Sequence, residues 1–86
     1  MPTMKPILNL NGTSREALID ARIKAREAVQ ALMKALGETA PNGRDYIGHP
    51  DAYKADLAVY RARFAALDAL HNDLGDEALA IQMGGA

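Results

Sequence analysis

Few residues in this chain of 86 have side chains whose types and spacing could carry out chemistry. Because the sequence contains no Cys, it excludes thiol catalysis, disulfides, iron–sulfur clusters and cysteine-based zinc sites. The only serine, Ser14, stands where a helix is predicted to begin, so capping explains it better than a role as nucleophile. The glycines lack the spacing of a phosphate-binding or dinucleotide-binding loop. We therefore expect no catalytic residue, no cofactor site and no enzymatic activity.

The two histidines are the remaining candidates for binding a metal. Asp68 lies one helical turn before His71, but Asp73, two residues after it, falls on a different side of a helix. A metal at His71 would need ligands from another helix or subunit, so a neutral imidazole packed in or beside the core is favoured. His49, next to Pro50, fits the start of a helix better than a metal ligand. We expect no metal site.

Paired carboxylates could serve in acid–base catalysis, and four acidic residues gather near the end of the chain: Asp68, Asp73, Asp76 and Glu77. Their spacing predicts that all four lie on the polar, solvent-facing side of a helix. A solvated helix face is therefore favoured over a catalytic pair. Exposed amides after Gly12 could hold an anion, although a helix cap would satisfy two of them.

The elements that position these residues are two predicted helices, and the first covers residues 14–36. Thr13 to Glu16 has the spacing of a capping box, and no helix-breaking residue follows until Gly37. Gly37 stands where a left-handed residue could end the helix. Apolar residues at steps of three and four form one buried stripe. Ile19 and Ile23 lie further around the helix and need a second surface to pack against.

The second predicted helix covers residues 51–82. Nine residues follow one another in alternating steps of four and three, which is a continuous heptad pattern. They are Tyr53, Leu57, Tyr60, Phe64, Leu67, His71, Leu74, Ala78 and Ile81. Because the pattern continues through Gly75, we expect one helix despite the unfavourable helix propensity of glycine. A helix that ends at Gly75 is the alternative.

The rest of the chain is predicted to be an extended arm over residues 1–12 and a long loop over residues 37–50. In the loop, Tyr46 and Ile47 are expected to pack back onto the helices. Two helices joined by one loop run antiparallel, which makes the chain a single all-α domain with the fold of a two-helix hairpin.

The register of the two helices follows from where the chain folds back. A fold-back near residue 43 would place Arg15 close to Asp73 and leave the last two turns of the second helix beyond the first. Apolar residues of the arm are expected to cover this overhang. They are Ile7, Leu8 and Leu10.

A lone pair of helices buries too little apolar surface to offset the conformational entropy of an ordered chain. We therefore expect a homodimer, with two hairpins packed as a four-helix bundle; burial against a different protein is the alternative. The candidate interface residues are the apolar residues outside the two main stripes: Ile19, Ile23, Val59, Ala66 and Leu70.

The charges argue against a general affinity for nucleic acids or anionic membranes, because ten Lys and Arg nearly balance eleven Asp and Glu. An alternative function is nucleic-acid binding or regulation through a basic patch formed by Arg22, Lys24 and Arg26. Acidic neighbours and the lack of interleaved aromatic residues disfavour it. No segment has the apolar length of a membrane span or a signal peptide, so a cytoplasmic location is expected.

Some features of the sequence resemble a family of small uncharacterised proteins of proteobacterial phages and prophages. The resemblance rests on an Ala-rich first helix, the loop Pro-Asn-Gly-Arg-Asp-Tyr at residues 41–46, Tyr-Arg-Ala-Arg at 60–63 and Leu-Ala-Ile at 79–81. It implies an accessory or assembly role, and it supplies no site residues.

Overall fold

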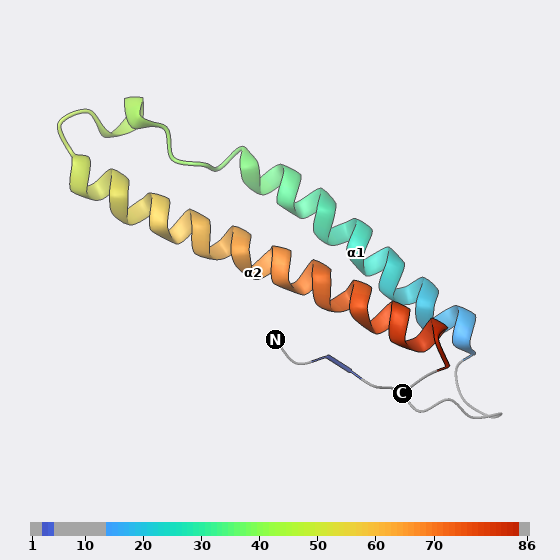
Figure 1. The fold of residues 1–86 in the computed structure, drawn as a ribbon. Coiled ribbons are helices and arrows are strands. Elements are labelled where there is room, and N and C mark those ends of the chain that lie inside the picture. Colours follow the sequence, from blue (N-terminus) through green and yellow to red (C-terminus); the bar gives the residue numbers. More distant parts are fainter. Residues whose placement is uncertain (1–2, 5–13, 85–86) are drawn as a thin grey trace.

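The computed structural model of the chain describes residues 3–4 and 14–84. Three helices lie in these ranges: α1 (Arg15–Gly37), the short 3₁₀ helix η1 (Gly43–Tyr46) and α2 (Pro50–Gln82). Helices α1 and α2 pack side by side and antiparallel (Figure 1). The predicted all-α hairpin is confirmed, and the bounds of both long helices agree with the predictions to within one residue.

Helix α1 begins with a side-chain cap, as its sequence predicts, but at a neighbouring residue. Ser14 is the N-cap, and its hydroxyl accepts a hydrogen bond from the backbone N–H of Ala17 at 3.2 Å. Thr13, which we expected to cap the helix, lies outside the described residues. The only serine of the sequence therefore has a structural role as the N-cap of α1.

The predicted left-handed end of α1 at Gly37 is wrong. Gly37 is the last residue of the helix, and the only glycines with positive φ among the described residues are Gly48 and Gly84. The backbone N–H of Glu38 donates to the carbonyl of Ala35 at 3.1 Å. This tightened last turn satisfies the carbonyls at the helix end, so a left-handed glycine is not needed.

Helix α2 passes through Gly75 without a break, which confirms the single helix and rules out the alternative that ends there. The glycine also allows a close approach between the helices. A Cβ placed on Gly75 would lie 3.1 Å from Arg26 Cζ. The missing side chain therefore makes room for a guanidinium of α1.

The register of the hairpin differs from the predicted one. The segment between α1 and α2 runs alongside the first turns of α2, and the chain reverses at Gly48, whose φ is +81° (Figure 1). Arg22 therefore lies against Glu77, whereas the predicted fold-back near residue 43 placed Arg15 near Asp73. The helices are shifted by roughly three turns relative to the prediction.

This shift leaves the start of α2, instead of its end, without cover from α1. Ile81, expected on an overhang, is only 1% exposed, while Leu79 on another side of the helix is 54% exposed. The predicted covering residues of the arm, Ile7, Leu8 and Leu10, lie outside the described residues. Tyr46 and Tyr53 pack together at the uncovered start of α2, with ring centroids 5.5 Å apart.

Ile47 does not pack back onto the helices, so that part of the loop prediction is wrong. Its side chain is 81% exposed, whereas Tyr46 is half-buried against α2. The two residues are consecutive at the chain reversal, and only the tyrosine faces α2.

The hairpin is an elongated rod with very little interior. The chain measures 63 × 20 × 17 Å, and the buried residues in its described part are Val29, Ile81 and the charged Glu77. A compact chain of this length has a radius of gyration of about 12 Å, but this chain has one of 18.2 Å. Neither helix, within the described ranges, has an apolar stretch long enough to cross a bilayer.

We expect Ile81→Ala to lower the free energy of unfolding by about 2 to 4 kcal/mol, because it empties a buried site. Leu79→Ala is the matched control and should lower it by less than about 1 kcal/mol, because Leu79 is half exposed. Urea denaturation followed by circular dichroism measures both. Equal losses would contradict the observed register.

Candidate functional site

An ion pair between Arg22 and Glu77 joins the two helices. Arg22 Nε donates to Glu77 Oε1 at 3.3 Å, and the side chains are 13% and 7% exposed. A second bond runs from Arg22 Nη1 to the carbonyl of Leu18 at 3.2 Å. The predicted solvent-facing position of Glu77 is therefore wrong, because Glu77 lies on the side of α2 that α1 covers in the observed register.

Arg26 makes the second polar connection between the helices, one turn further along α1. Its Nε donates to the backbone carbonyl of His71 at 3.1 Å, and its Nη2 lies 3.5 Å from His71 Nδ1. The space beside Gly75 admits this guanidinium. The Arg26 guanidinium thus connects α1 to the backbone of α2 at His71.

His71 is half-buried beside the core, in line with the position expected for a neutral packed imidazole. Its Nε2 is buried without a hydrogen-bond partner among the described residues, and so is Asp73 Oδ2. The described ranges contain no group of three or more side chains arranged to hold a metal ion. Arg26 and His71 therefore connect the two helices through the hydrogen bonds between them.

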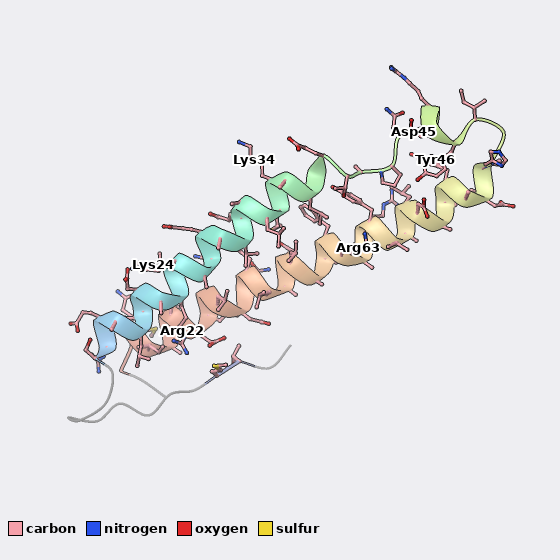
Figure 2. The ribbon with its side chains drawn as sticks, turned by 180° about the vertical axis from the view of Figure 1, so that it is seen from behind. Arg22, Lys24, Lys34, Asp45, Tyr46 and Arg63 are labelled. Atoms are coloured by element: carbon pink, nitrogen blue, oxygen red, sulfur yellow. The ribbon has the colours of Figure 1, made fainter. Side chains whose placement is uncertain are left out.

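Lys24, the third member of the predicted basic patch, pairs within its own helix. Its Nζ lies 2.9 Å from Asp20 Oδ2, and both side chains are largely exposed. The hydrogen bond to Asp20 and its negative charge raise the pKa of Lys24 above its usual value. In Figure 2 Arg22 lies on the α2 side of the hairpin, whereas Lys34 projects away from α2. Arg22 and Arg26 therefore face α2, and Lys24 is the largely exposed member of the three.

The loop is anchored by a tyrosine. Tyr46 is the last residue of η1 and lies on the side that faces α2 (Figure 2), and its hydroxyl donates to Asp56 Oδ2 at 2.6 Å. This hydrogen bond raises the pKa of the Tyr46 phenol above its usual value, with smaller contributions from burial and from the charge of Asp56. The bond holds the loop along the uncovered start of α2.

Two of the predicted interface residues lie together on α1. Ile19 and Ile23 line a shallow, mostly apolar depression with Ala17, and two acidic residues, Glu16 and Asp20, border it. Ile23 is 43% exposed. This depression is one candidate for a contact surface.

The other three predicted interface residues lie elsewhere. Leu70 shares a depression with Ala25 of α1, and Ala25 is about 200° around the helix from Ile23. Val59 lines a separate hollow beside the loop, and Ala66 is exposed. The depressions therefore do not bring the five residues together, and their role as an interface stays a prediction.

A surface on α2 was missed by reasoning from the sequence. Tyr60, Arg61, Phe64, Ala65 and Asp68 line a shallow depression on that helix. Phe64 belongs to the heptad pattern, but it is 37% exposed because the shifted register brings α1 to its end near this point. The sequence did contain a signal for this surface, because Arg61 and Asp68 have opposite charges, lie seven residues apart and flank Phe64.

Replacing Glu77 with Ala is expected to lower the free energy of unfolding by about 3 kcal/mol, because it leaves the Arg22 guanidinium without its carboxylate at a mostly buried position. The double variant Arg22→Met/Glu77→Leu should recover most of that loss. Asp20→Ala removes an exposed pair and should change stability by no more than about 0.5 kcal/mol. Equal effects of the two alanine variants in urea denaturation would show that the buried pair does not hold the register.

No family model matches this sequence, and no curated protein or solved structure matches it either. The resemblance to phage and prophage proteins therefore stays a prediction. The surfaces of the hairpin itself must carry any proposal about function.

Proposed function

We propose that this chain is a non-enzymatic interaction or assembly protein that acts first by binding a second copy of itself. The observation that carries the proposal is the small number of buried apolar side chains. Among the described residues only Val29 and Ile81 are buried apolar side chains, while Ile23, Leu32, Val59 and Phe64 are each at least 37% exposed. Side chains of this kind stabilise a fold only when something covers them.

The exposed area supports the same proposal. A compact monomer of this mass exposes about 4,900 Å², whereas the chain exposes 6377 Å². The excess is on the order of 1,400 Å², and a standard interface removes about 800 Å² from each partner. A second hairpin packed against the first through a standard interface would cover more than half of this excess and produce a four-helix bundle.

The side-chain chemistry supports binding over catalysis. The chain has no Cys, its only serine caps α1, and the His71 region has no metal-binding group of three side chains within the described ranges. The alternative of nucleic-acid binding has less support, because Arg22 and Arg26 make hydrogen bonds within the hairpin and only Lys24 of the three is largely exposed. The alternative is that a different protein covers the exposed apolar side chains, in which case the purified chain would be a monomer.

Sedimentation equilibrium of the purified chain between 1 and 100 µM tests the proposal. We expect a dimer at tens of micromolar, with dissociation at the low end of the range. A monomer across the whole range would contradict self-association.

A further inference from the structure

The depression on α2 that sequence reasoning missed has the symmetry of a dimer contact. Arg61, Phe64, Ala65 and Asp68 occupy positions i, i+3, i+4 and i+7, so they share one side of the helix. The two charged residues stand at the ends and the two apolar ones between them. Neither Arg61 nor Asp68 has an ion-pair partner among residues 14–84.

We infer that a second copy of this chain docks antiparallel on α2, with the two-fold axis passing between Phe64 and Ala65. This inference rests on the proposed self-association and assigns its interface. In a two-fold symmetric contact, if residue i of one subunit touches residue j of the other, then residue j of the first touches residue i of the second. Arg61 of one subunit then faces Asp68 of the partner subunit, and the reciprocal pair forms on the other side of the axis.

The shape of the surface fits the same arrangement. At the axis, Phe64 of one subunit lies over Ala65 of the partner subunit, so a large side chain meets a small one on both sides. Tyr60 borders the depression and adds aromatic surface. A parallel arrangement would place Arg61 beside Arg61 of the partner subunit, and like charges would oppose it.

The charges also distinguish this surface from the depression on α1. Both titratable residues that line the α1 depression, Glu16 and Asp20, are acidic. A symmetric contact there would bring four carboxylates together around Ile23, and Lys24 of each subunit pairs with only one of them, Asp20. The α2 depression carries one charge of each sign and is complementary to itself.

A charge-swap experiment tests the α2 contact. Arg61→Glu and Asp68→Lys should each weaken dimerisation by about tenfold or more in sedimentation equilibrium, because each replaces two attractions with two repulsions. An equimolar mixture of the two variants should form a heterodimer about as tight as the wild-type dimer. In that mixture both facing pairs again have opposite charges.

Two further variants make the result specific. Arg63→Glu carries the same charge change on the loop side of α2, and it should leave dimerisation within about twofold of wild type. Ile23→Glu probes the α1 depression and should also leave the dimer intact. Circular dichroism at concentrations where each variant is dimeric should show the same helix content for all of them, because these side chains lie at the surface.

A wild-type dimer that neither Arg61→Glu nor Asp68→Lys weakens would overturn the α2 contact while leaving self-association in place. Loss of the dimer in Ile23→Glu alone would move the interface to α1. A monomeric wild type would overturn both this contact and the proposed function. Failure of the mixed variants to associate would show that Arg61 and Asp68 do not face each other.

Discussion

Two helices packed side by side can each bury only one stripe of their surface, and this limit governs the whole molecule. The Ala-rich α1 brings little apolar volume to its stripe, and the described part of the hairpin has only two buried apolar side chains. Helix α2 is ten residues longer than α1, so part of its heptad pattern has no helix to face. The exposed side chains at both flanks of the rod follow from this geometry.

The register of the hairpin depends on polar contacts as much as on apolar ones. Arg22 reaches Glu77, and Arg26 reaches the carbonyl of His71 through the space that Gly75 leaves. Mostly buried charges fix geometry well because any slip leaves a charge without its partner. These contacts draw α1 toward the second half of α2, which leaves the first half to the loop and to solvent. Phe64 lies close to where that cover ends.

The helices could be predicted from the sequence, whereas their relative position could not. Caps, breakers and the steps of four and three are local signals, and they located α1 and α2 to within one residue. The register depends on where the loop reverses, at Gly48, and on the contacts that Arg22 and Arg26 make with α2, neither of which is a local signal. Because the register was misplaced, Glu77 was assigned to solvent and Phe64 to the seam. The α2 depression could be found only after both were placed.

The melting temperature as a function of protein concentration tests most directly whether the hairpin needs a partner to complete its core. If association contributes to the stability of the fold, the melting temperature should rise by about 4 °C for each tenfold increase in concentration. A melting temperature that stays constant between 1 and 100 µM, with a single cooperative transition, would contradict the account. It would show that one hairpin holds itself together with the few side chains it buries.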